Sequence, residues 1–162
     1  MVTPCLEGTQ QPTLNNIQRW VEDPQESPIL WLCGMAGTGK TTVALTVANA
    51  LYKGVPLTEG GHPPVNSFLG ASFFFKQTDT SRNNIKTFFS TLAKSLTEIQ
   101  ELRPHIVSAI EKNLEIGTKA PQHQFQDLFI EPLSTLEKQQ FTSIRLLVIV
   151  DALDECENEE VD

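Results

Sequence analysis

The chain has 162 residues, of which 40% are hydrophobic, so its length suits one ordinary domain with a buried core. Twenty acidic side chains against twelve basic ones give a formal net charge of −8. Because nucleic-acid binding needs clustered Lys and Arg to displace counterions, this balance argues against a nucleic-acid partner and against broad contact with an anionic membrane.

Neither an export signal nor a membrane span is predicted. The stretch MVTPCLEGTQ has no basic n-region and no apolar h-region, and no apolar run approaches the roughly 20 residues that a membrane span requires. The three cysteines, Cys5, Cys33 and Cys156, are odd in number and lie far apart, which favours reduced thiols. We expect a soluble, cytoplasmic protein.

Residues 1–27 are polar and rich in turn-forming residues, and we interpret them as a linker that contains one short helix. The helix is predicted from apolar residues at helical spacing, namely Leu14, Ile17, Trp20 and Val21. Residues 28–33, PILWLC, form a short apolar run that ends at a glycine. The run has no polar alternation, which predicts a strand buried on both faces.

Residues 41–53, TTVALTVANALYK, have apolar positions at helical spacing with Ala between them, which predicts a helix packed closely against that strand. Residues 54–67 contain three glycines and three prolines and are predicted to be a loop. A second strand, an amphipathic helix and two further helical segments are then expected at residues 69–75, 85–99, 104–116 and 122–137, with Pro121 and Pro132 as breaks.

Residues 144–150, IRLLVIV, are predicted to be a strand of the kind found inside parallel sheets, buried by its apolar residues. The acidic sequence DALDECENEEVD follows it. Strands that alternate with helices along the chain indicate an α/β fold with a mostly parallel sheet.

The sequence GMAGTGKTT at residues 34–42 matches the phosphate-binding pattern G-x-x-x-x-G-K-[ST]. A predicted buried strand precedes it and a predicted helix follows it, which is the context that this motif requires. The flanking elements therefore disfavour the alternative, a glycine-rich turn without a ligand. The expected nucleotide-binding residues are Gly34, Met35, Ala36, Gly37, Thr38, Gly39, Lys40, Thr41 and Thr42.

Each residue type in the motif suits a polyphosphate ligand. Glycines allow positive φ and let backbone N–H groups approach phosphate oxygens without an obstructing Cβ. The helix that begins near Lys40 directs its unpaired amides and its positive dipole end toward the same anion. Lys40 supplies a charge for the outer phosphates, Thr41 a hydroxyl that would bind Mg²⁺, and Thr42 a hydroxyl for the inner phosphate.

Asp151 follows directly after the apolar strand, at the carboxyl end where ligands bind in open α/β sheets. Because Mg²⁺ bridges the outer phosphates, we predict that Thr41 and Asp151 are its protein ligands. Asp154 and Glu155 come next, and either one is a candidate general base for an attacking water. A solvated acidic cap is the alternative for this pair.

Together, GMAGTGKTT and LLVIVDALDE resemble the motifs of the NACHT branch of the signal-transducing (STAND) P-loop ATPases, whose acidic motif reads hhhhD-[GAS]-h-D-E. Ala152 matches the small-residue position, and Asp154 and Glu155 match the paired acids. More of the chain resembles one subgroup, the nephrocystin-3-type NACHT proteins that are abundant in fungi. The similar stretches are CLEGTQQPTLNNIQRWVEDPQESPILWLCGMAGTGKTT, LGASFFFKQ and FIEPLSTL.

The resemblance implies a three-layer P-loop NTPase core with a parallel sheet. Residues 28–162 would form a partial NACHT domain that runs from the Walker A motif to the Walker B motif. ATP or GTP would bind at residues 34–42 with Mg²⁺, and slow hydrolysis would reset a signalling switch. Lys40, Asp154 and Glu155 are the catalytic residues that this resemblance implies.

Proteins of this type resemble NLR-like innate-immunity and heterokaryon-incompatibility receptors, which reach protein partners through effector and repeat domains. The resemblance also implies nucleotide-dependent oligomerisation of a full-length protein. In this family the segment just before the P-loop strand often touches the base. Residues 5–9 match that segment, with Gln10 where an Arg is commoner.

In the implied sheet order, the strand between those at 28–33 and 144–150 comes later in sequence than Asp162. We therefore expect an incomplete core, without the strands after Walker B, and a chain that is marginal as a folded ATPase by itself. Each unpaired backbone group would cost on the order of 1–3 kcal/mol.

Two other functions stay open. One is a truncated decoy or scaffold that binds nucleotide or a protein without hydrolysis. The other is a P-loop kinase, which would be expected to carry an arginine-rich lid soon after the first helix of the core, whereas residues 54–67 contain no arginine.

Overall fold

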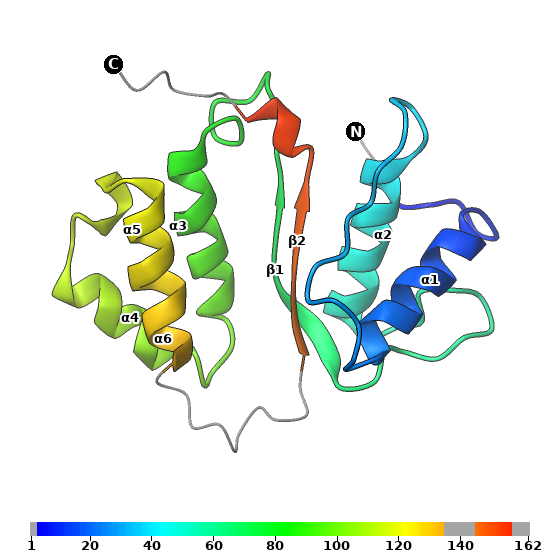
Figure 1. Cartoon of the computed structure of the whole chain (residues 1–162), viewed down its shortest axis with the longest axis horizontal. Coiled ribbons are helices and arrows are strands. Elements are labelled where there is room, and N and C mark those ends of the chain that lie inside the picture. The colour runs from blue at the N-terminus through cyan, green and yellow to red at the C-terminus, as the bar shows by residue number, and fades with distance from the viewer. Residues whose placement is uncertain (1–2, 135–144, 157–162) are drawn as a thin grey trace. The chain divides into compact units, whose positions relative to one another are not determined.

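Helices outnumber strands in the computed structural model, which describes residues 3–134 and 145–156. β1 and β2 are neighbours in a small parallel sheet, so the expected mixture of helices with parallel strands is present (Figure 1). The helices and strands in chain order are α1 (Gln11–Glu22), α2 (Lys40–Lys53), β1 (Ser67–Phe74), α3 (Ile85–Leu96), α4 (Arg103–Lys112), α5 (Pro121–Phe125), α6 (Glu131–Ser134) and β2 (Arg145–Asp151).

The chain divides into two compact units. The first unit contains Met1–Leu69 and Ser143–Asp151, and the second contains Gly70–Thr142 and Ala152–Asp162. Consequently α1, α2 and β2 belong to the first unit, and α3 to α6 belong to the second. Asp151 shares a unit with the glycine-rich motif, whereas Asp154 and Glu155 belong to the other unit.

The core of the first unit is built by the predicted apolar face of α1 and by α2. Leu14, Ile17 and Val21 recur at helical spacing and are buried, which confirms the helix predicted there. Val43 and Val47 of α2 belong to the same cluster, because each helix must cover its apolar stripe with a neighbour. The remaining buried members are Ala50, Leu51, Leu57 and Leu147.

Residues 28–33 differ from the prediction, since the structure assigns no strand to them. Leu30 and Leu32 pack against the core of the first unit, while Ile29 and Trp31 are 74% and 75% exposed. A strand needs a hydrogen-bonded neighbour, and in the described ranges β1 and β2 pair with each other alone. Burial on both faces was therefore the wrong expectation, because one face of this segment has no packing partner there.

β2 confirms the strand predicted before Asp151, apart from Ile144, which lies outside the described residues. Its burial was predicted wrongly. Leu147 is buried and Ile149 packs on the core, on the face that α2 covers, but Val148 and Val150 remain 48% and 40% exposed. The continuous apolar sequence indicated two covered faces, whereas the exposure alternates along the strand.

The second unit has an aromatic core. Phe73 and Phe75 are buried, and their rings contact that of Phe88 from α3 at centroid distances of 5.2 and 5.5 Å. Its helices confirm the helical segments predicted between residues 85 and 134, although α4 ends at Lys112, earlier than expected. Residues 135–137, the end of the last predicted helix, lie outside the described residues.

Of the two predicted proline breaks, Pro121 does separate two helical segments, whereas Pro132 does not end a helix. Pro121 begins α5, where its missing N–H would have no helical partner anyway. Pro132 lies within α6, directly after a π-helical turn (Gln126–Ile130) that follows α5. Because a proline cannot donate the usual helical hydrogen bond and its ring crowds the preceding turn, a widened turn at this place lets the helix continue through it.

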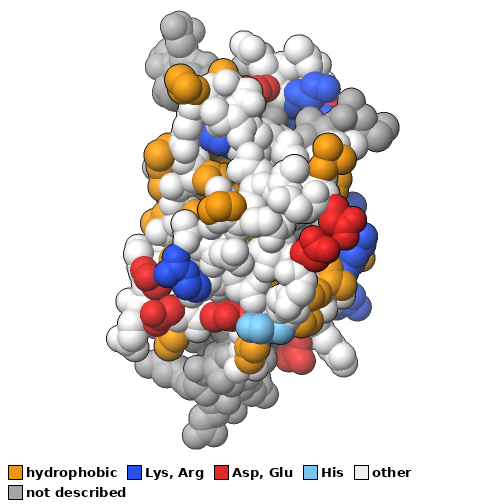
Figure 2. Space-filling view, turned by 90° about the vertical axis from the view of Figure 1, so that its right-hand side faces the viewer, with side chains coloured by type: hydrophobic (Ala, Val, Ile, Leu, Met, Phe, Trp, Pro, Cys, Tyr) orange, Lys and Arg blue, Asp and Glu red, His pale blue; other side chains and the backbone are white. Residues whose placement is uncertain are grey.

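Among the helices that the structure describes, none is long and apolar enough to cross a membrane. Figure 2 looks onto the side of α1 and α2, where hydrophobic side chains are exposed in separate groups between charged side chains of both signs. Leu6, Ile29, Trp31 and Met35 are examples of exposed hydrophobic residues in the first unit. Scattered exposure of this kind is normal and indicates no site by itself.

Candidate functional site

The glycine-rich loop, residues 34–39, leads directly into α2, which begins at Lys40 as predicted. Gly37 and Gly39 have φ of 79° and 87°, in the left-handed region that glycine adopts without strain. Gly39 is the N-cap of α2, and no side chain caps this helix. The first amides of α2 therefore lack a capping side chain, and the positive end of the helix dipole coincides with them.

Lys40 folds back over the loop. Its Nζ donates to the carbonyl oxygen of Gly34 at 2.8 Å and to that of Met35 at 3.0 Å. The Thr38 hydroxyl also donates to the Met35 carbonyl, at 2.9 Å. No carboxylate in the described residues forms an ion pair with Lys40, so its charge is available to an anion.

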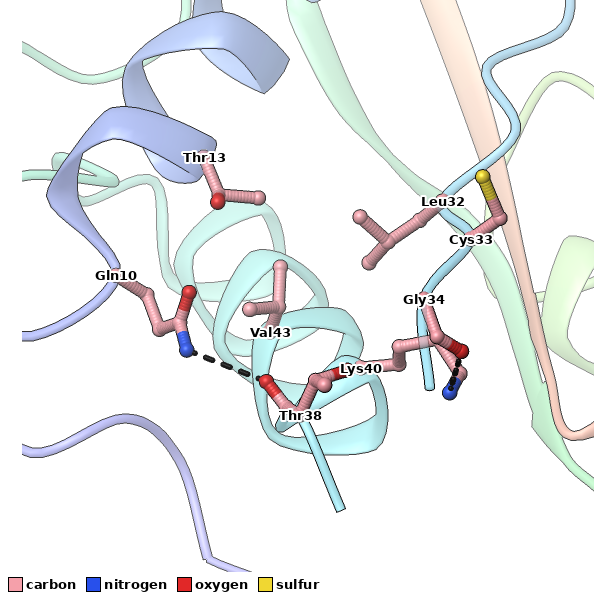
Figure 3. Close-up of a pocket in the computed structure, with 8 residues that line it drawn as sticks. All are labelled: Gln10, Thr13, Leu32, Cys33, Gly34, Thr38, Lys40 and Val43. Carbon is pink, nitrogen blue, oxygen red and sulfur yellow. Dashed lines mark hydrogen bonds between the residues drawn. The ribbon is translucent and has the colours of Figure 1, made fainter. Parts of the chain in front are cut away.

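A hollow of about 280 Å³ adjoins this loop, near the lower end of the usual range for ligand pockets (Figure 3). Leu32, Cys33 and Val43 supply apolar surface, while Gln10 and Thr13 supply polar groups from α1 and its N-cap. The other lining residues are Gly34, Thr38 and Lys40. The hollow thus combines a charged end with an apolar wall.

The sequence did not indicate Gln10 and Thr13 as site residues. They lie more than 20 residues before the motif, and the packing of α1 on α2 brings them to the hollow. The helical spacing of Leu14, Ile17 and Val21 was the available signal, because that face fixes how α1 docks.

Thr41 and Asp151 lie in the same unit, at the N-terminal end of α2 and the C-terminal end of β2. α2 packs against β2, and both residues are half-buried. A hydroxyl and a carboxylate are oxygen ligands of the type that Mg²⁺ prefers. No group of three or more His, Cys, Asp and Glu in the described ranges could hold a metal, so a cation held by Thr41 and Asp151 would need phosphate oxygens to complete its shell.

Asp154 and Glu155 are exposed in a short 3-10 turn (Leu153–Glu155) of the second unit. Ala152 precedes the turn with φ of 54°, a left-handed value that is uncommon for a residue other than glycine. Glu155 Oε2 accepts a hydrogen bond from the backbone N–H of Gln77 at 2.9 Å. A role in hydrolysis for either acid stays a prediction.

Comparisons with known proteins found one similar curated protein and one matching family. An adenylyl-sulfate kinase of Chloroflexus aurantiacus (strain ATCC 29364 / DSM 637 / Y-400-fl) is 28% identical to the chain over 132 residues, which cover 72% of the chain and 70% of the kinase. No solved structure matches the chain. The sequence profile of the nephrocystin 3 N-terminal family matches residues 8–161, almost the whole chain. The chain belongs to the nephrocystin 3 N-terminal family.

Proposed function

We propose that the chain binds ATP or GTP together with Mg²⁺, through a P-loop of the NTPase type. The observation that supports this most is the start of α2, which no side chain caps, behind a loop with two left-handed glycines. Lys40 lies at this helix start and has no ion-pair partner among the described residues. Such a helix start is an anion site, because its N–H groups and dipole favour negative charge. The similarity to a kinase that is named for adenylyl sulfate also supports nucleotide binding.

In this proposal, the amides of residues 34–42 surround the phosphate chain and Lys40 neutralises the outer phosphates. Thr41 and Asp151 are the residues that would hold Mg²⁺, which offsets phosphate charge when bound. Asp154 or Glu155 would orient and deprotonate the attacking water during slow hydrolysis. The apolar wall of Leu32 and Val43 would keep bulk water from one side of the ligand.

We further propose that the nucleotide site works in a NACHT module of a STAND-type signalling switch. The family membership and the acidic motif that begins at Asp151 support this finer assignment. In a full-length protein, nucleotide state would then control contacts with protein partners and oligomerisation. A fragment that binds without hydrolysis, as a decoy or scaffold, is the alternative within the same site.

Binding of fluorescent ATP and GTP, with and without Mg²⁺, tests the proposal. Lys40→Ala should weaken binding about 10- to 100-fold, because a charge-assisted contact contributes roughly 1.5–3 kcal/mol. Lys53→Ala removes an equal charge from the other end of α2 and should leave affinity unchanged. Asp151→Asn should reduce the difference that Mg²⁺ makes. Equal binding by the wild type and Lys40→Ala would refute the assignment.

The kinase similarity favours one second candidate, phosphate transfer to a small acceptor. Incubation with ATP and adenylyl sulfate separates the possibilities. Acceptor-dependent loss of ATP with a phosphorylated product would identify a kinase, and ATP loss that is independent of the acceptor would identify an NTPase. Binding without turnover would support the decoy.

A further inference from the structure

Gln10 connects the start of α1 to the glycine-rich loop. Its side-chain Nε2 donates to the carbonyl oxygen of Thr38 at 3.3 Å, across 28 residues of sequence (Figure 3). The other hydrogen bonds of residues 34–39 that the structure describes join the loop to itself or to α2. Among the residues that the structure describes, Gln10 is thus the one whose hydrogen bond joins this loop to a part of the first unit outside α2.

The backbone at Gln10 is held in an unusual conformation. Its φ is 56° and its ψ is 17°, a left-handed conformation that residues with a Cβ rarely adopt, and it serves as the N-cap of α1 without a side-chain cap bond. Its carbonyl accepts the first helical hydrogen bond, from the Leu14 N–H at 3.0 Å. Strained conformations persist where the surroundings fix them, and here the side chain points toward the loop.

The surroundings of Gln10 are anchored on both sides. Before it, the Cys5 N–H donates to the Thr46 hydroxyl of α2 at 2.8 Å. After it, Leu14 and Ile17 bury the face of α1 in the core. Gln10 therefore reaches the loop from a fixed position, and its amide lies over Gly39, where an added Cβ would come within 3.4 Å of Nε2.

We infer that Gln10 is a positioning residue, whose amide holds the Thr38 carbonyl and thereby fixes the loop in the shape that receives phosphate. The inference rests on the proposed nucleotide site for its ligand. Gln10 acts through the loop backbone and not through the base, so its contribution is the same for any ligand with the same phosphate chain. Loss of one such hydrogen bond should weaken binding about three- to tenfold.

Inorganic tripolyphosphate, which has no base, is the decisive probe beside ATP and GTP. In the whole chain, Gln10→Ala should lower the affinity for all three ligands by the same factor. Gln10→Asn, which tolerates the left-handed backbone but is one methylene too short to reach Thr38, should keep or raise the melting temperature and still bind weakly. Gln25→Ala, at an exposed glutamine that does not line the hollow, is the control and should change neither the affinity nor the melting temperature.

Each other outcome counts against the inference. A loss confined to ATP or GTP, with tripolyphosphate unaffected, would show that Gln10 contacts the nucleoside. Unchanged affinity for all ligands would also overturn it. If the wild type binds none of them, the proposed function fails. Amide NMR of the free protein then tests whether Gln10 fixes the shape of the loop. The order parameters of Thr38 and Gly39 should fall in Gln10→Ala but not in Gln25→Ala, and equal values would overturn the inference.

Discussion

The two left-handed glycines of the loop allow a quantitative test of its shape. Gly37 and Gly39 have φ of 79° and 87°, and an L-residue in this region costs about 1–2 kcal/mol. A Cβ at Gly37 would meet nothing within 4 Å, so Gly37→Ala is a purely conformational change. We expect Gly37→Ala and Gly39→Ala each to weaken ATP binding about 5- to 30-fold, since the free loop relaxes out of the left-handed shape and binding must restore the strain.

Gly34 should respond for a different reason. Its φ is not in the left-handed region, but an added Cβ would lie 3.0 Å from the Thr38 hydroxyl oxygen and 3.9 Å from the Thr38 Cβ. Gly34→Ala therefore requires the hydroxyl to move by a few tenths of an ångström. Thr38→Ala removes this hydroxyl, so the two substitutions should be non-additive in ATP affinity, whereas Gly37→Ala and Thr38→Ala should be additive.

Titration calorimetry with ATP and Mg²⁺ measures these affinities, and thermal unfolding gives the stability of each variant. Gly54→Ala is the matched control, because it creates the same backbone strain at the C-cap of α2, where φ is 62° and nothing lies within 4 Å. It should lower the melting temperature and leave affinity unchanged. Wild-type affinity in Gly37→Ala would refute the reasoning, since the left-handed loop would then be unnecessary for binding.

Three further outcomes are expected outside the loop. Leu14→Ala should lower the free energy of unfolding by about 2–5 kcal/mol in urea titrations, because Leu14 is 2% exposed in the core. The pKa of Asp79 is lowered from 3.8 to about 2 by hydrogen bonds from the Ser81 hydroxyl, from Arg82 and from the Ser81 N–H. The ionised Asp79 therefore stabilises the fold above pH 3.8, and this stabilisation is lost as the pH falls through about 2. Carboxyl NMR titration should show this midpoint, and Arg82→Ala should raise it. Ala152→Gly should change the unfolding free energy by less than about 1 kcal/mol, since relieved strain offsets glycine entropy, whereas Ala152→Val should lower it by more.

Local sequence patterns predicted the helices and strands that are determined by residues within a single segment. The periodic apolar faces indicated α1 and α2, and the motif predicted that α2 starts near Lys40, because helical spacing and an N-terminal glycine act within one segment. The strand before Asp151 was likewise predicted from its own residues.

Properties that depend on a neighbour were not predictable in this way. Residues 28–33 and the strand around Val148 are apolar, which indicates burial. Ile29, Trp31 and Val148 are nevertheless exposed, because burial depends on what packs against them. Gln10 reaches the loop through the docking of α1, its side chain has no motif, and its left-handed φ of 56° is unusual for glutamine. Gln10 stands where an Arg is commoner in the family that the sequence resembles, and this departure does not indicate a contact with the loop.

The division of the acidic motif between the two units leads to a last expectation. Asp151 belongs to the unit that contains the loop, and in the proposed function it holds the cation. Glu155 belongs to the second unit and accepts a hydrogen bond from the Gln77 N–H. Nucleotide affinity should therefore depend on Asp151 and hardly on Glu155.

Substitution of Glu155 should slow hydrolysis without weakening nucleotide binding. Glu155→Gln keeps an oxygen that can accept from Gln77, so it should preserve the fold of the second unit and bind ATP as the wild type does, with slower turnover. Asp151→Asn, in contrast, should weaken the Mg²⁺-dependent binding of ATP. Equal losses of affinity in both variants, measured by the same ATP titration, would contradict this separation, because the two carboxylates would then act as one binding group.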